Sequence, residues 1–239
     1  MPTRFDSQPK EKKEFIKIAG ILFLAFLLRV VFVFAIHPPE KYLYSDMEWY
    51  TIKAIKLAHG VQEVPWDTFC PSGTPYLYSL FFHMPNPFLG IKIFNVIAGV
   101  LSCYLIYRST EILFGGKAAL IAGFFSSINY LFIDFSGYVL SETPFILSLS
   151  LMFYFLIKSI TLGDYSSKRI YSLLSGFTIV LCASFKTSIL LFVPIFAFWW
   201  ILNHKKYQLT QNLSFYLLGF LPFFIVICLK TSLILGQFS

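Results

Sequence analysis

Charged residues are scarce in this sequence. Of its 239 residues, only 13% are Asp, Glu, Lys or Arg, whereas 57% are hydrophobic and 20% aromatic. A soluble domain carries about a quarter charged residues, so this composition excludes a single water-soluble core that hides all the apolar surface. The mean hydropathy of +0.71 leads to the same conclusion. We therefore predict an integral membrane protein.

Cysteine is also rare, and its placement excludes a disulfide framework. Cys103, Cys182 and Cys228 fall inside apolar runs, and only Cys70 lies in a polar stretch. No Cys/His spacing typical of a zinc site is present. The net charge of +7 comes without a basic run interleaved with aromatics, so we assign it to membrane topology and predict no nucleic-acid partner.

Several catalytic motifs are missing as well. The sequence has no Walker motif, no GxSxG and no HExxH, and Gly115-Gly116 is not followed by a phosphate-loop pattern. No internal repeat is evident. The sequence therefore gives no indication of a common nucleotide-binding or hydrolase site.

Long apolar runs are what the sequence has in abundance. Because a helix needs about 20 residues to cross a bilayer, we predict an all-α fold with about seven transmembrane helices. The first starts after a basic segment and is too long for a cleaved signal sequence. The predicted helices are residues 15–36, 88–107, 118–132 and 143–160, two within 170–202 that are separated at Phe185-Lys186-Thr187-Ser188, and 213–229.

The distribution of Lys and Arg predicts the orientation. Residues 1–14 are expected to be a disordered cytoplasmic tail, and residues 15–239 the polytopic membrane module. The loops on the tail's side are the basic ones, as the positive-inside rule requires. The first loop, residues 37–87, is then extracytoplasmic, together with Glu142 and Lys186. The basic residues assigned to the cytoplasmic side are Arg108, Lys117, Lys168, Arg169, Lys205 and Lys206.

The first outer loop contains short amphipathic segments. Ser45-x-x-Glu48 has the spacing of a capping box, and the helix it would open ends at Gly60. Apolar and basic residues are mixed along that helix, which is typical of a helix lying in the membrane interface. A rigid turn at residues 71–75 precedes a second amphipathic piece.

Two carboxylates open this helix, and we predict Asp46 as the catalytic residue. It lies at the membrane boundary in a loop otherwise rich in aromatics and prolines, although a role in complementing the helix dipole is the structural alternative. Glu48 either caps the helix or orients the acceptor. The pair also has a weak likeness to a carboxylate site for Mg²⁺ or Mn²⁺, and no other metal ligands are predicted.

Three further ionisable residues are substrate-binding candidates. Glu142 opens a helix as part of Ser141-Glu-Thr-Pro144, so it acts either at the site or as a first-turn residue. Lys186 lies in a helix break and either binds a lipid phosphate or extends to the interface. Arg29 lies in the outer half of the first helix, where it either orients Asp46 or Glu142 or extends toward the interface.

Together these short patterns resemble the GT-C membrane glycosyltransferases, in the branch similar to protein O-mannosyltransferases and lipid A aminoarabinose transferases. The resemblance covers nearly the whole chain. It rests on Arg29, Tyr44-Ser-Asp46-x-x-x-Tyr50-x-x-x-Ala54, Gly73-Thr-Pro75-x-Leu77-Tyr78, Asn95-x-x-x-Gly99, Phe114-Gly115, Ser141-Glu142-x-Pro144 and the break around Lys186.

The resemblance implies an inverting sugar transferase in the cell membrane of a bacterial-type cell, with its active face extracytoplasmic. Such enzymes take a sugar from a polyprenyl-phosphate carrier and give it to a protein, lipid or glycan. The family's acidic residue maps onto Asp46, and Glu48, Tyr50 and Glu142 are expected to contact substrates. Lys186 and Arg29 are the cations for the leaving phosphate. Family members continue through more helices, so the chain is expected to correspond to their N-terminal seven-helix module.

Two alternatives stay open at this point. One is a non-catalytic polytopic protein, either transporter-like or an assembly subunit, for which polar helix interiors and broken helices are expected. The other is an inactive, truncated copy of such a transferase.

Overall fold

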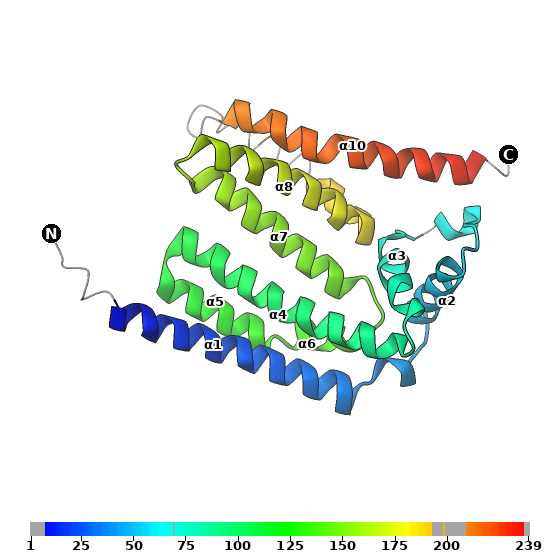
Figure 1. The fold of residues 1–239 in the computed structure, drawn as a ribbon, viewed down its shortest axis with the longest axis horizontal. Coiled ribbons are helices and arrows are strands. Elements are labelled where there is room, and N and C mark those ends of the chain that lie inside the picture. The colour runs from blue at the N-terminus through cyan, green and yellow to red at the C-terminus, as the bar shows by residue number, and fades with distance from the viewer. Residues whose placement is uncertain (1–7, 69, 193–197, 199–208, 237–239) are drawn as a thin grey trace.

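The structure, a computed structural model, describes residues 8–68, 70–192, 198 and 209–236 (Figure 1). These residues form helices and loops, with no strand within those ranges, so the predicted all-α fold is confirmed. The α-helices are α1 (Gln8–Val31), α2 (Asp46–Ala58), α3 (Gly73–Ser79), α4 (Pro87–Phe114), α5 (Gly116–Ile128), α6 (Tyr130–Asp134), α7 (Glu142–Thr161), α8 (Tyr165–Phe185) and α10 (Leu209–Gly236). The shorter turns are a π-helix at Phe32–Ile36 and 3₁₀ helices at Pro39–Lys41, Pro65–Thr68, Leu80–His83, Phe135–Gly137 and Thr187–Leu191.

Fewer helices qualify as spans than the sequence predicted. Four in the described part of the chain are long and apolar enough to cross a membrane, and α5 with α6 makes a fifth if that pair, bent by 54°, counts as one span. The seven-span count is therefore not confirmed. The predicted sixth helix falls largely outside the described residues. The spans are Glu14–Lys41, Pro87–Phe114, Glu142–Thr161 and Leu213–Gly236.

Two helix boundaries differ from the prediction. Helix α1 begins at Gln8, so the second half of the segment expected to be a disordered tail is helical. Helix α4 continues past residue 107, where the prediction ended it, and Arg108 and Glu111 pair with each other at i,i+3 spacing on the surface of the added turns. The helix ends at Gly115, whose φ of 82° favours glycine.

The predicted capping box is wrong. Ser45 does precede α2, but its side chain makes no capping hydrogen bond, and its φ of 51° is unusual for a residue other than glycine. Instead, the Met47 N–H donates to the Tyr44 carbonyl at 3.1 Å, which closes a tight turn before the helix. A non-glycine residue in such a conformation costs on the order of 1–3 kcal/mol and persists only where the surroundings hold it. The surroundings include Met47 and Tyr50, which are both buried.

The helices form two groups joined by the α4–α7 contact. Helix α1 packs on α4 and α5, whereas α7, α8 and α10 pack in that order on the other side (Figure 1). The outer-loop helices α2 and α3 lie together at one end of the bundle, and the start of α1 lies at the other end (Figure 1). A core of Met47, Ala54, Tyr78, Ile91 and Val139 fixes the outer loop to the start of α4.

Helices α8 and α10 approach so closely that only glycine fits at the contact. A Cβ added at Gly176 would lie 2.0 Å from the Tyr216 carbonyl oxygen, and one at Gly219 would lie 2.1 Å from the Leu173 carbonyl oxygen. Such small residues let two helix backbones touch where lipid supplies no hydrophobic driving force. The pair therefore packs backbone against backbone.

A buried carboxylate connects the outer loop to α10. The side chains of Lys53 and Glu63 are only 3% and 5% exposed and lie 2.9 Å apart. Lys230 of α10 also pairs with Glu63, and the Tyr76 hydroxyl donates to Glu63 Oε2 at 2.7 Å. Burial by itself raises the pKa of Glu63, but the hydrogen bonds from Lys230, Lys53 and Tyr76 outweigh it and lower the pKa to about 2.

We expect Gly176→Ala and Gly219→Ala each to destabilise the protein by about 1–3 kcal/mol, because the added methyl group forces α8 and α10 apart. The measurement is the thermal unfolding temperature in detergent. Gly20→Ala in α1 is the matched control, since no atom lies within 4 Å of the added Cβ and alanine is the better helix former. An equal loss at all three positions would contradict the α8–α10 contact.

Stability is expected to depend on the charge of Glu63. Its folded pKa of about 2 is depressed from 4.5, so its contribution is complete above pH 4.5 and is lost as the pH falls toward 2. The wild-type unfolding temperature should therefore drop across this window. Glu63→Gln should be less stable near neutral pH and should vary less over the same window. Parallel pH profiles for the two proteins would refute the role of Glu63.

Candidate functional site

The predicted catalytic carboxylate lies on the first turn of α2, at the outer-loop end of the bundle. Asp46 is exposed, and its backbone directly follows the strained turn at Ser45. One turn later Tyr50 is buried and makes a side-chain hydrogen bond with Ser141 at the start of α7. Burial raises the pKa of Tyr50, and the charges of Glu142 and Asp46 add to the rise. Both carboxylates are therefore within electrostatic reach of one phenol.

Glu142 and Lys186 form an ion pair at the same end. The Lys186 Nζ lies 2.8 Å from Glu142 Oε1, and the ammonium also lies over the Phe145 ring at 5.9 Å from its centroid. Lys186 has extended backbone at the break after α8, as the sequence predicted. Its side chain is 36% exposed, so donors remain for a ligand. The predicted convergence of these two residues on one face is confirmed.

Buried polar residues hold the loop that carries Glu142. The Tyr78 hydroxyl lies 3.1 Å from Asn95 Oδ1 and 3.2 Å from the Leu140 carbonyl oxygen. The Asn95 amide donates to the Ser136 and Tyr138 carbonyls at 3.1 and 3.0 Å. Tyr78 and Asn95 belong to the motifs quoted above, and they act here by positioning the segment just before α7.

A cavity of about 760 Å³ opens between the outer loop, the end of α8 and α10. Its wall includes Phe185 and Thr187, the two neighbours of Lys186 in the chain. Its wall is mostly apolar, with hydroxyl groups and one ammonium group among the lining side chains. Burial raises the pKa of Cys70 in this wall, and the charge of Asp46 adds to that effect. Asp46 is on α2, which packs against α3, and α3 contributes to the cavity wall. The lining residues are Thr68, Cys70, Pro71, Ser72, Gly73, Tyr76, Leu77, Leu80, Leu181, Ala183, Ser184, Phe185, Thr187, Ile227, Lys230, Thr231 and Ile234.

Two residues near the cavity were not predicted from the sequence as site residues. Lys230 lines it, and Glu63 holds the Lys230 ammonium in place. The available signal was the position of Lys230 in an otherwise apolar helix, where a charge is usually functional and partnered. Glu63 had no comparable signal, because its partners come from α2, α3 and α10.

Arg29 lies elsewhere, and the expectation that it orients Asp46 or Glu142 is wrong. It is 0% exposed, inside the bundle. Its Nη1 donates to the carbonyls of Ala25 and Ser127 at 3.0 and 3.4 Å, and its Nη2 lies 3.5 Å from the Cys103 sulfur. Ser127 is in the last turn of α5, where free carbonyls and the helix dipole favour a cation. Arg29 therefore joins helices in the core.

The predicted carboxylate pair does not fit a metal ion. Asp46 and Glu48 are both in α2, and residues two apart on a helix do not face each other. Within the described residues, no group of three or more His, Cys, Asp or Glu is arranged to hold a metal. Glu48 is exposed in the first turn of α2, and no capping bond forms at Ser45.

Comparison with known proteins identifies a family. The sequence model of the dolichyl-phosphate-mannose-protein mannosyltransferase family matches residues 70–230. The matched part includes most of the residues that line the cavity, together with Glu142 and Lys186, and it begins after Asp46. No match was found among curated proteins or among solved structures. The match covers more than half of the chain, which therefore belongs to the dolichyl-phosphate-mannose-protein mannosyltransferase family of GT-C membrane glycosyltransferases.

Proposed function

We propose that the protein transfers a sugar from a polyprenyl-phosphate carrier to a hydroxyl group of a protein, lipid or glycan at the outer face of the cell membrane. The observation that carries this proposal is the convergence of Asp46, the Glu142–Lys186 pair and a large apolar cavity at one end of the bundle. A lipid-linked sugar has a long apolar chain and a charged phosphate, and this end offers a place for each.

In the proposed reaction, the acceptor hydroxyl attacks the anomeric carbon of the sugar while Asp46 takes its proton. The bond from the anomeric carbon to the phosphate oxygen breaks, and the electron pair leaves with the polyprenyl phosphate. Attack opposite the leaving group inverts the anomeric centre. The phosphate gains negative charge as it leaves, so a cation held beside it stabilises the transition state.

Lys186 is the proposed cation for that phosphate. It is partly exposed, lies beside cavity residues Phe185 and Thr187, and is oriented by Glu142. Lys230 adds a second positive charge to the cavity wall. Tyr50 and Glu142 are the proposed contacts for the sugar or acceptor, because Tyr50 lies one turn after Asp46 and bonds to Ser141 beside Glu142, and Glu142 pairs with Lys186.

The orientation of the chain supports the outer face. Basic residues lie at the bundle end opposite α2 and α3, in the last turns of α4 and the first turns of α5 and α8 (Figure 1). By the positive-inside rule that end is cytoplasmic. The described basic residues there include Lys17, Arg108, Lys117, Lys158, Lys168 and Arg169.

Asp46→Asn should lower sugar transfer by about 10²–10⁴-fold, the usual contribution of a general base. The measurement is transfer from a radiolabelled polyprenyl-phosphate sugar to acceptors in membranes that contain the full protein. Glu48→Gln is the matched control and should keep most of the activity, because Glu48 lies on another side of the same helix turn. Unchanged transfer by Asp46→Asn would reject Asp46 as the base. No transfer by the wild-type protein with any polyprenyl-linked sugar would favour the non-catalytic alternative.

Lys186→Met should lower transfer by about 10²–10³-fold with little loss of stability, since a partly exposed ion pair contributes about 0–1 kcal/mol. A charge swap, Glu142→Lys with Lys186→Glu, should restore the ion pair without restoring transfer. Lys56→Met, exposed on α2 at the same end, is the matched control and should stay active. Full activity of the swapped protein would mean that the pair is only structural.

A further inference from the structure

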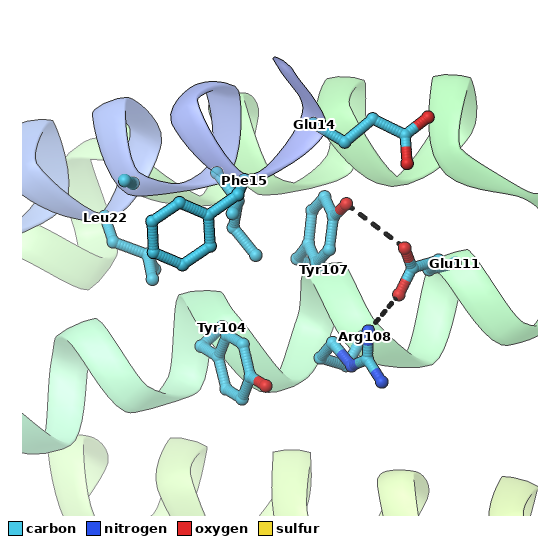
Figure 2. A pocket seen from close by; sticks show the side chains of 9 residues that line it. Glu14, Phe15, Leu22, Tyr104, Tyr107, Arg108 and Glu111 are labelled. Carbon is cyan, nitrogen blue, oxygen red and sulfur yellow. Dashed lines mark hydrogen bonds and ion pairs between the residues drawn. The ribbon is translucent and has the colours of Figure 1, made fainter. Parts of the chain in front are cut away.

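A second cavity lies at the opposite end of the bundle, between the first turns of α1 and the last turns of α4 (Figure 2). Its volume is about 370 Å³. Helix α1 contributes Phe15, Ile18 and Leu22 to its wall, and α4 contributes the rings of Tyr104 and Tyr107. Most of the wall is therefore apolar or aromatic, which suits a hydrocarbon chain.

Charged groups lie at one end of this cavity (Figure 2). The Arg108 Nη1 donates to Glu111 Oε2 at 2.5 Å, and the Tyr107 hydroxyl donates to Glu111 Oε1 at 3.3 Å. The Arg108 Nε is buried and has no hydrogen-bond partner. Glu14 supplies a second carboxylate from α1, and no ion pair to it occurs in the described part of the chain. The Arg108 side chain is 36% exposed, so its remaining guanidinium N–H groups line the cavity together with the Glu14 carboxylate.

We propose that this cavity binds a phospholipid whose headgroup is zwitterionic and carries a primary amine. The lipid phosphate accepts hydrogen bonds from Arg108, the ammonium donates to Glu14 and Glu111, and an acyl chain lies along the α1 wall. The two tyrosines and the helix ends place the charges at headgroup depth. The site is separate from the proposed transferase site and does not depend on it.

The charges of the lining select between headgroups. The cavity holds one guanidinium and two carboxylates, so an anionic headgroup without an amine adds negative charge to a lining in which carboxylates already outnumber the guanidinium. A quaternary ammonium balances the charge but has no N–H to donate to Glu14 or Glu111. Only a primary ammonium next to a phosphate satisfies both kinds of group.

The test is native mass spectrometry of the full protein in detergent with three lipids of identical acyl chains, whose headgroups are phosphoethanolamine, phosphocholine and phosphoglycerol. We expect the phosphoethanolamine lipid to bind about tenfold more tightly than either other lipid, which is the effect of one or two charge-assisted hydrogen bonds. Equal binding of all three, or a preference for phosphoglycerol, would overturn the proposal.

Substitution of the carboxylates should remove the preference. Glu14→Gln combined with Glu111→Gln is expected to bring the ethanolamine and choline lipids to within about twofold of each other. Asp164→Asn is the matched control, because Asp164 lies in the loop before α8 at the same end and Asn caps a helix equally well. It should keep the full preference. An unchanged preference in the double variant would reject the carboxylates as headgroup ligands.

A measurement on the wild-type protein covers the case in which the double variant does not fold. Stepwise N-methylation of the ethanolamine headgroup removes one donor at a time and leaves the charge in place. Binding should weaken with each methyl group. Binding that does not change along this series would also overturn the proposal.

Discussion

The position of the outer loop depends on a single carboxylate. Glu63 receives ammonium groups from α2 and α10 and a hydroxyl from α3, so the two outer-loop helices meet the distant α10 at two oxygens. Removing one partner from such a buried cluster leaves an uncompensated charge. The cavity beside the proposed active site is bounded by the same α3 and α10. Its shape therefore rests on an electrostatic contact in a molecule that is otherwise packed by apolar side chains.

Much of this architecture was predictable because few residue types can face lipid. Long apolar runs gave the helices, and a polar tetrad within one of them gave the break at Lys186. The location of Glu142 and Lys186 at one end of the bundle followed from topology, whereas the ion pair between them was not predicted. Local sequence patterns predicted less well. Ser45-x-x-Glu48 has the capping spacing, yet packing of Met47 and Tyr50 imposes another backbone at Ser45. Tertiary contacts that join distant segments, such as those of Glu63, leave no mark in the local sequence.

Arg29 illustrates a charge whose role the sequence cannot define by itself. At its depth, either a carboxylate partner or extension to the interface was expected. The structure offers a third solution, in which a broken helix ends beside the guanidinium and presents the Ser127 carbonyl to it. Gly99 leaves the space that the side chain fills, since a Cβ there would lie 2.4 Å from the Arg29 Nε. The break after Ile128 thus supplies a hydrogen-bond acceptor to the buried charge. On α4, Asn95-x-x-x-Gly99 acts as a packing motif.

The unusual backbone at Ser45 has a consequence for how Asp46 would meet a substrate. The turn is held on its far side by buried Met47 and Tyr50, so this segment is already ordered before anything binds. An acceptor then spends no binding energy on fixing the carboxylate's backbone, which is the advantage of a preorganised site. If Asp46 is the base, a carboxylate on a fixed backbone favours acceptors whose hydroxyl reaches it. Acceptor choice at such a site is made by fit to a fixed shape and not by closure around the ligand.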